Sequence, residues 1–174
     1  MHITLAMVMS INGRTTAGRR SSVHDWSSTE DKTYFDALKK KHNLILMGRN
    51  TFTASRKQIT LSSKTLRVVF TKTPHRFIKE TVADQLTFTN ASPNTVVKGL
   101  ERRGFTRALL VGGAELNSAF LKAGLIHELW ITVEPALFEG GKGLFEKIVG
   151  QQRFQLVAVK RMNKEGTLLL KYRR

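Results

Sequence analysis

The sequence contains no cysteine, and it has only three prolines among its 174 residues. The lack of cysteine excludes disulfide bonds, a cysteine nucleophile and thiolate metal sites. No stretch approaches the roughly 18 consecutive apolar residues that a membrane-spanning helix needs, so we expect no membrane association. The five histidines show none of the spacings typical of metal ligands, and we therefore predict no bound metal.

Acidic residues are scarce, because 13 Asp and Glu face 29 Lys and Arg, which gives a formal net charge of +16. Such a surplus attracts polyanions and is common in nucleic-acid-binding proteins. The basic residues are spread along the chain, however, with short clusters such as Arg19-Arg20 and Lys39-Lys40-Lys41 and no interleaved aromatic residues. We expect no specific nucleic-acid partner. A basic nucleic-acid binder without catalysis remains the alternative, and a positive field equally suits an enzyme with polyanionic ligands.

The length and the patterning indicate a single domain over residues 1–174. The first 13 residues are apolar but carry no basic leader, so we expect a buried strand there rather than a signal peptide, and a cytoplasmic protein. Short β-rich runs alternate with amphipathic segments, which is the pattern of an α/β sheet. The predicted strands are Ile3–Met9, Leu44–Met47, Arg67–Thr71, Leu86–Thr89, Ala108–Val111, Glu128–Val133, Phe154–Lys160 and Thr167–Tyr172, and the predicted helices are Thr29–Lys41, Pro93–Arg103 and Ala114–Lys122.

Local signals fix several of these elements. The run Ser28-Thr29-Glu30-Asp31 has the pattern of a capping box at a helix start. Ser92 followed by Pro93 marks a second start, and Gly104 supplies the left-handed residue that ends that helix. Asn163-Lys164-Glu165-Gly166 is a hairpin signal, so we expect the sheet to end in an antiparallel pair.

Three predicted strands end in residues suited to binding phosphate. The strand Leu44–Met47 is followed by Gly48-Arg49-Asn50-Thr51, and Ala108–Val111 is followed by Gly112-Gly113. The strand that starts at Arg67 ends at Thr71 and Lys72. In open α/β sheets ligands bind at the carboxyl ends of the strands. Glycine lets the backbone approach a phosphate, a helix N-terminus offers free N–H groups, and Arg49 adds a bidentate donor. These turns therefore predict a dinucleotide site at one edge of the sheet, without the usual Rossmann fingerprint.

The order of these motifs resembles the dihydrofolate reductase superfamily, over about residues 3–145. The wording is closest to the branch that contains the reductase domain of riboflavin biosynthesis, the C-terminal part of the bifunctional deaminase-reductase. The resemblance implies a three-layer α/β fold with a mostly parallel eight-stranded sheet and an antiparallel C-terminal hairpin. It rests on Ser10-Ile11-Asn12-Gly13, Trp26 with Glu30-Asp31 and Phe35, Met47-Gly48-Arg49-Asn50-Thr51-Phe52, Gly112-Gly113-Ala114-Glu115-Leu116-Asn117, Leu125-Ile126-His127-Glu128-Leu129 and Ile131-Thr132-Val133-Glu134-Pro135.

The resemblance implies NADPH as cofactor, which would supply the hydride while the protein aligns the rings and excludes water. Arg49, with Thr71 or Lys72, would face the adenosine 2′-phosphate. The residues implied to hold the pyrophosphate are Gly48, Thr51, Gly112, Gly113 and Ala114, and those implied to border the nicotinamide are Ala6, Asn12 and Gly13.

The resemblance also places the substrate. In dihydrofolate reductases a tryptophan is followed after five residues by an acid and after four more by a phenylalanine, which here gives Trp26, Asp31 and Phe35. Asp31 would bind the pterin and favour its protonation, Phe35 would pack on the ring, and Thr132 would support the carboxylate, with Ala6 beside the ring. A structural alternative has Asp31 closing a capping box, which leaves Glu30 as the acid. Trp26 and Phe35 are equally compatible with a place in the core.

Two substrates follow from the two branches. The first expectation is reduction of dihydrofolate to tetrahydrofolate. The alternative is 5-amino-6-(5-phosphoribosylamino)uracil, a pyrimidinone whose phosphate would meet Arg14, Arg19, Arg20 or Arg56. Against it, Val111 stands where that branch usually has an acid, and the chain has no room for a deaminase domain. In its favour, residues 21–26 partly resemble its substrate loop. A homodimer with Leu125-Ile126 and the strand Glu128–Val133 at its edge is a further expectation from this branch.

Overall fold

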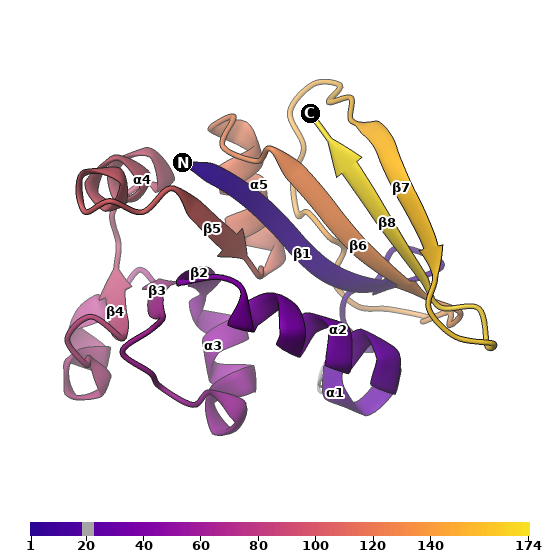
Figure 1. Cartoon of the computed structure of the whole chain (residues 1–174), viewed down its shortest axis with the longest axis horizontal. Helices are drawn as coiled ribbons and strands as arrows, with labels where there is room; N and C mark the ends of the chain where they lie inside the picture. Colours follow the sequence, from indigo (N-terminus) through magenta and orange to yellow (C-terminus); the bar gives the residue numbers. More distant parts are fainter. Residues whose placement is uncertain (19–22) are drawn as a thin grey trace.

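The computed structural model describes residues 1–18 and 23–174, so that Arg19, Arg20 and the start of the expected substrate loop lie outside the described residues. Its centre is an eight-stranded sheet with the strand order β4-β3-β2-β5-β1-β6-β8-β7 (Figure 1). The strands are β1 (His2–Ser10), β2 (Leu44–Gly48), β3 (Leu66–Phe70), β4 (Leu86–Thr89), β5 (Arg107–Leu110), β6 (Glu128–Glu134), β7 (Gln155–Arg161) and β8 (Leu168–Arg173).

The helices cover both faces of this sheet. They are α1 (Val23–Trp26), α2 (Thr29–Lys40), α3 (Arg49–Ser55), α4 (Pro93–Arg102) and α5 (Ala114–Lys122), with 3-10 turns η1 (Arg56–Gln58) and η2 (Pro74–Glu80). One apolar cluster joins the sheet to α4 and α5 through residues such as Leu100 and Phe120. The other joins it to α2 and α3 through Leu38 and Phe52. In Figure 1, α4 and α5 lie above the sheet and α2 and α3 below it, which gives the three layers.

The pairing of the strands confirms the predicted fold class. All neighbours from β4 to β6 run parallel, whereas β8 is antiparallel to both β6 and β7. The predicted strands and helices agree with the observed ones to within about two residues at each end. The short helix α1 and the turns η1 and η2 were not predicted, because one or two turns are too short for a clear apolar period.

The expected dimer edge is wrong in one respect. Strand β6 is hydrogen-bonded to β1 on one side and to β8 on the other, so it has no free edge to offer a second chain. The outer strands of the sheet are β4 and β7.

Within the described ranges, no helix combines the length and the apolar character needed to cross a bilayer. In the same part of the chain, no group of three or more His, Asp or Glu side chains is placed to hold a metal ion.

A buried carboxylate joins the end of β6 to two other segments. Glu134 is only 4 % exposed. Its Oε1 accepts hydrogen bonds from the backbone N–H of Ser28 at 2.8 Å and from the Ser28 hydroxyl at 2.7 Å. Its Oε2 accepts a 2.7 Å bond from the hydroxyl of Thr167, which directly precedes β8. Glu134 therefore fixes the start of α2 against both β6 and the C-terminal hairpin.

The loop of that hairpin is organised by Asn163. Its Oδ1 accepts the backbone N–H groups of Gly166 and Thr167, and its Nδ2 donates to the Thr167 hydroxyl at 2.9 Å. The predicted turn at residues 163–166 is thus a side-chain-closed turn that presents Thr167 to Glu134.

We predict that Glu134→Ala lowers the free energy of unfolding by about 3 kcal/mol, because it leaves one buried N–H and two hydroxyls without their acceptor. Urea denaturation measures this loss. Glu139→Ala, at an exposed position in the following loop, is the matched control and should change stability by no more than about 0.5 kcal/mol. Equal effects of the two substitutions would contradict the role given to Glu134.

Candidate functional site

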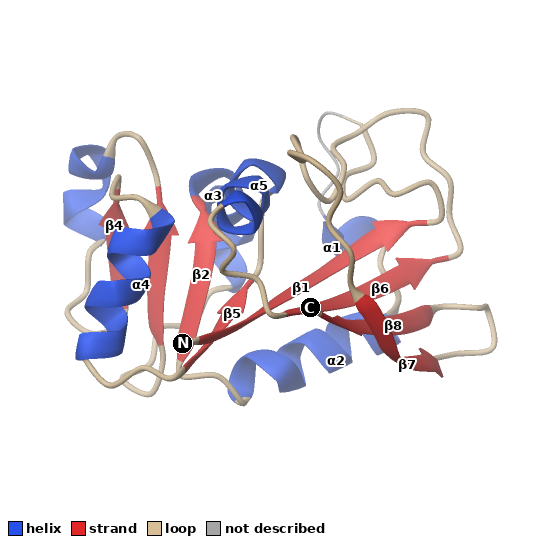
Figure 2. Cartoon of the chain, turned by 90° about the horizontal axis from the view of Figure 1, so that it is seen from above, coloured by secondary structure: helices blue, strands red, loops and turns tan. Residues whose placement is uncertain are grey.

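The carboxyl ends of β2 and β5 meet through their glycines. The backbone N–H of Gly48, the last residue of β2, donates a 2.7 Å hydrogen bond to the carbonyl of Gly112, just after β5. Gly112 has φ +90°, and the next peptide bond, Gly112–Gly113, is cis. The arrow of β2 in Figure 2 points toward α3 and α5, the two helices that begin at this edge. The two glycine-bearing turns therefore converge on one edge of the sheet, as the sequence predicts.

The starts of α3 and α5 leave backbone donors uncapped. Gly48 precedes α3 and Gly113 precedes α5, and neither helix has a side-chain cap, whereas Ser28 and Ser92 cap α2 and α4. The first N–H groups of a helix have no partner within the helix, so they are available to an anion. A Cβ at Gly48 would lie 3.4 Å from the Gly113 nitrogen, and one at Gly113 would lie 3.5 Å from the Thr51 hydroxyl. Because neither glycine carries a side chain, the backbone N–H groups at the starts of α3 and α5 stay accessible. The residues at these two helix starts fit a pyrophosphate.

Positive and hydroxyl side chains flank these turns. Arg49 is the first residue of α3 and is exposed, and among the described residues it forms no ion pair. Thr71 is buried directly after β3, beside β2, and its hydroxyl accepts the N–H of Thr73 at 3.3 Å. Lys72 is exposed next to it. Ala114, the first residue of α5, is 7 % exposed. The residues that the resemblance implies for NADPH binding after β2, β3 and β5 therefore lie at the same edge of the sheet, where these strands have their carboxyl ends. We call it the cofactor edge.

The loop after β1 is tied to the loop after β6. Asn12 Nδ2 donates to the carbonyl of Phe138 at 2.8 Å, while its Oδ1 accepts the Ser10 hydroxyl and the Phe138 N–H. Gly13 follows with φ +75°, which favours glycine. The Asn12 side chain thus positions the two loops relative to each other, and its direct contact with a nicotinamide stays a prediction.

A second contact brings these loops closer still. The N–H of Thr15 donates to the carbonyl of Lys142, and the N–H of Lys142 donates to the Thr16 hydroxyl. Gly141 has φ +117°, and a Cβ there would lie 1.9 Å from the Thr16 carbonyl oxygen. Only glycine fits at this position, because any side chain would collide with backbone.

Asp31 is buried, 6 % exposed, in the first turn of α2. Its N–H donates to the Ser28 hydroxyl at 3.2 Å, so Ser28 is the predicted cap. The reciprocal bond from the Ser28 N–H goes to Glu134, however, and not to Asp31. The structural alternative, in which the Asp31 carboxylate closes a capping box, is therefore wrong. The carboxylate instead interacts with the hydroxyl of Thr132 on β6.

The strand registers explain this meeting. Trp130, Thr132 and Glu134 alternate with residues that face the other layer, so they share the face of β6 that α2 covers. Ala6 of β1 is the register partner of Trp130 and is also buried on this face. The structure thus brings Asp31 and Thr132 together, with Ala6 in the adjoining strand.

Burial raises the pKa of the Asp31 carboxyl above its ordinary value, and this is the largest influence on it. The Thr132 hydroxyl acts in the opposite direction, and the negative charge of Glu134 raises the pKa of Asp31 further. Tyr34 lies three residues further along the same helix. Its burial, and to a smaller extent the charge of Asp31, raise its pKa to about 12. The Tyr34 hydroxyl is buried and has no hydrogen-bond partner among the residues that the structure describes. Burial therefore makes the charged form of Asp31 costly, and a pKa shifted in this way is typical of functional sites.

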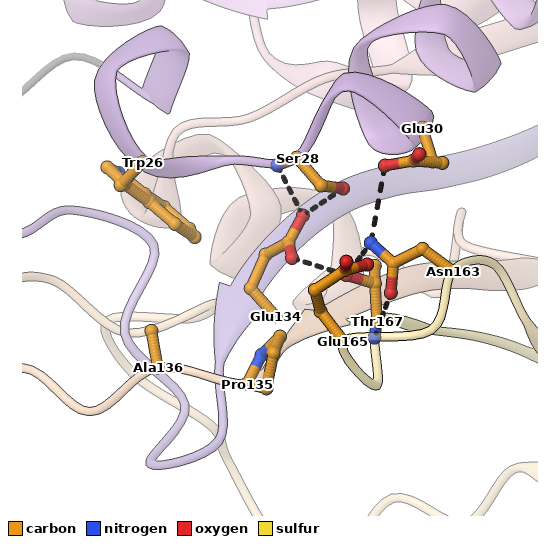
Figure 3. A pocket seen from close by; sticks show the side chains of 9 residues that line it. All are labelled: Trp26, Ser28, Glu30, Glu134, Pro135, Ala136, Asn163, Glu165 and Thr167. Atoms are coloured by element: carbon orange, nitrogen blue, oxygen red, sulfur yellow. Dashed lines mark hydrogen bonds between the residues drawn. The ribbon is translucent and has the colours of Figure 1, made fainter.

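A cavity of about 370 Å³ opens at the junction of α1, α2, β6 and the β7–β8 turn (Figure 3), and Asp31 and Thr132 are not among its lining residues. Its wall includes Ser28, Glu30 and Glu134, of which Ser28 and Glu134 are hydrogen-bonded to each other. Glu30, the fallback acid, is exposed, and its Oε2 accepts a 3.2 Å bond from Asn163. The full lining is Trp26, Ser28, Glu30, Glu134, Pro135, Ala136, Asn163, Glu165 and Thr167.

The two aromatic residues predicted to bind substrate have different surroundings, since Trp26 lines the cavity and Phe35 packs against the core. The ring of Trp26 meets Phe138 edge to face, with the ring centres 5.0 Å apart. Its indole N–H is buried and has no hydrogen-bond partner within the described part of the chain. Phe35 packs against the α2-side core, with the Lys39 ammonium 4.9 Å from its ring centre. The contact of either ring with a substrate stays a prediction.

Glu134 was missed as a site residue, together with Asn163 and Thr167. The signal available in the sequence was an acid two positions after Thr132 on a predicted strand, which alternation places on the same face. Its partners, Ser28 and Thr167, are distant in the chain, so no local pattern predicts them.

We predict that Asp31→Asn stabilises the protein at neutral pH. The raised pKa means that the folded state keeps a proton that the unfolded state, with an ordinary value of 3.8, has already lost. Stability of the native protein should therefore fall as the pH rises from that value through the folded pKa, and the variant should lack this decline. Urea denaturation at several pH values measures the difference, and a variant less stable by a pH-independent amount would contradict the prediction.

The chain matches the family of the RibD C-terminal domain over residues 1–168. A search of curated proteins finds no match. Among solved structures, a protein of Shewanella sp. PV-4 assigned to riboflavin biosynthesis is similar, with 21 % identity, a TM-score of 0.81, and coverage of 100 % of this chain and 99 % of that chain. A pyrimidine reductase-like protein of Corynebacterium diphtheriae has 14 % identity and a TM-score of 0.75, with coverage of 99 % and 91 %.

A third similar structure is the diaminohydroxyphosphoribosylaminopyrimidine deaminase/5-amino-6-(5-phosphoribosylamino)uracil reductase of Thermotoga maritima. It has 15 % identity and a TM-score of 0.78, and the match covers 99 % of this chain but 56 % of that chain. At these identities the solved structures establish the fold, whereas the family match covers nearly the whole sequence. The expectation of dihydrofolate as substrate receives no support from these comparisons. The chain belongs to the RibD C-terminal domain family, whose members are reductases with a dihydrofolate-reductase-like fold and NADPH as cofactor.

Proposed function

We propose that the protein reduces 5-amino-6-(5-phosphoribosylamino)uracil, or a closely related ribosylaminopyrimidinone, with NADPH. The observation that carries the proposal is the family match over residues 1–168, together with a buried acid and hydroxyl next to the cofactor edge. The sequence alone favours dihydrofolate because of the spacing of Trp26, Asp31 and Phe35. That spacing fits any planar, N–H-bearing ring, since Asp31 recognises donors and not a particular bicycle.

The cofactor edge supplies the binding groups. The uncapped N–H groups at the starts of α3 and α5 would hold the pyrophosphate, with the Thr51 hydroxyl between them. Arg49, with Thr71 and Lys72 nearby, would face the 2′-phosphate, because a dianion needs a fixed positive partner. Bound NADPH would supply a hydride to C1′ of the ribosyl group, whose bond to the ring oxygen breaks while that oxygen takes up a proton.

The substrate side is supplied by α2 and β6. Asp31 would accept hydrogen bonds from the ring N–H groups of the pyrimidinone, and Thr132 holds the carboxylate in place. The burial that raises the pKa of Asp31 also keeps water away and strengthens each hydrogen bond. Ala6, small and buried, would leave room for two stacked rings on this face of β1.

The substrate phosphate needs a cation, and of the two predicted arginines that the structure describes, Arg14 is the more available. Its Nη1 donates to the Gly141 carbonyl at 3.3 Å, while its buried Nε has no partner among the described residues. Arg56 is paired with Glu80 at 3.0 Å and is therefore less available. We propose Arg14 as the phosphate-binding residue among those that the structure describes.

Turnover tests the proposal. The full chain should oxidise NADPH, followed by its absorbance, with 5-amino-6-(5-phosphoribosylamino)uracil and not with dihydrofolate. Asp31→Asn should lower kcat/KM by about a hundredfold. Asp36→Asn, exposed on the same helix, is the matched control and should leave turnover unchanged. Turnover of dihydrofolate alone would overturn the choice of substrate.

The reading of the 2′-phosphate is tested by binding. We predict that Arg49→Ala weakens NADPH by at least about tenfold but NADH by less than about twofold, because only NADPH carries the extra dianion. Fluorescence titration measures both dissociation constants, and Arg153→Ala, exposed before β7, serves as the control. Equal losses for both cofactors would show that Arg49 does not contact this phosphate.

A further inference from the structure

A second cavity, of about 330 Å³, lies at the opposite edge of the sheet from the proposed cofactor site. It is formed where α2 ends and where β2, β3 and β5 begin, and these parallel strands are neighbours in the order β3-β2-β5. In Figure 2, β2 points from this edge toward α3 and α5. Five residues of β2 separate the two edges, or about 15 Å. The lining is Lys40, Lys41, His42, Asn43, Lys64, Thr65, Thr106 and Arg107.

The charge of this cavity is entirely positive. Lys40 and Lys41 come from the end of α2, Lys64 from the turn before β3, and Arg107 from the first position of β5. No acidic side chain lines the cavity, and none of these four cations forms an ion pair with a carboxylate in the part of the chain that the structure describes. Nearby, the Arg67 guanidinium donates to the Thr65 carbonyl and adds a fifth positive charge behind the wall.

A helix dipole accounts for only part of this cluster. Lysines in the last turn of a helix offset its negative end, which explains Lys40 and Lys41. Lys64 and Arg107 belong to other segments and reach the same cavity from the starts of β3 and β5, outside the last turn of any helix. Four like charges around one cavity repel one another and lower the stability of the empty protein. A bound anion would relieve that repulsion.

The neutral lining groups also suit phosphate oxygens. Asn43 offers an amide, and Thr65 and Thr106 offer hydroxyls between the cations. Lysine binds phosphate as a flexible point charge, while Arg107 supplies a planar fork of donors. The cations come from three chain segments around a concave space, which matches several phosphate groups of one small molecule better than the long backbone of a nucleic acid.

We propose that this basic cavity binds a small anion carrying two or more linked phosphate groups, at a site separate from that of the cofactor. Such a site would give a role to part of the +16 net charge, which the proposed reductase chemistry does not explain. Its ligand would stabilise the folded chain in proportion to its concentration over its dissociation constant.

Inorganic triphosphate is the probe, titrated calorimetrically into the full chain at low salt. The native chain should bind one equivalent. The double variant Lys64→Gln/Arg107→Gln should weaken binding by at least about tenfold. The control Lys98→Gln/Lys122→Gln removes the same charge from exposed positions on α4 and α5 and should change it by less than about twofold. Absence of saturable binding, or equal losses in both variants, would overturn the proposal.

Two competition arms separate this site from other anion-binding surfaces. Saturating NADPH should leave the triphosphate affinity unchanged, and full displacement would place the anion at the cofactor edge and overturn the proposal. A single-stranded RNA without terminal phosphate should not displace triphosphate, and displacement would show a nucleic-acid surface instead. Thermal unfolding without ligand checks that both double variants are folded, and a triphosphate-induced rise in Tm lost only in the cavity variant supports the site independently.

Discussion

The hydrogen bonds of Glu134 determine where the reactive face of this molecule can form. One carboxylate oxygen receives both donors of Ser28, and the other receives Thr167. This junction fixes the start of α2 against the end of β6, in addition to the apolar packing of the helix, and so helps to hold Asp31 near Thr132. The same junction sets a second negative charge near Asp31, which adds to the effect of burial on its pKa. The carboxylate of Glu134 therefore both joins the three segments and contributes to the raised pKa of Asp31.

The two edges of the sheet follow from the same parallel arrangement. At the carboxyl ends of β2 and β5, glycines replace side-chain caps and expose backbone donors around Gly48 and Gly113. At the amino ends of the same strands, long cationic side chains surround a cavity. Both edges suit anions, but by different means, since one uses fixed backbone dipoles and the other uses mobile charges. The first gives geometric selectivity and the second gives attraction that salt can screen.

Much of this arrangement could be predicted from sequence because it depends on local signals. Ser28 caps α2, the turn at Asn163 closes a hairpin, and the glycines after β2 and β5 meet because neighbouring parallel strands end at the same edge. The role of Glu134 could not be predicted in this way, since its partners lie 106 and 33 residues away and only the folded sheet joins them. The expectation of a free edge at β6 failed for a related reason, because the pairing of β6 on both sides is a property of the topology. The comparisons give dihydrofolate no support, and the sequence could not decide the substrate because an acid and an aromatic at helical spacing indicate the shape of a site more than its ligand.

The contact between Gly141 and the Thr16 carbonyl joins two segments that are far apart in the chain. The turns proposed to bind the cofactor come before α5 in the chain, whereas the loop after β1 is held by hydrogen bonds to Phe138 and Lys142, 126 residues later. A chain that ended before Phe138 would therefore lack the partners that position Asn12 and Thr16.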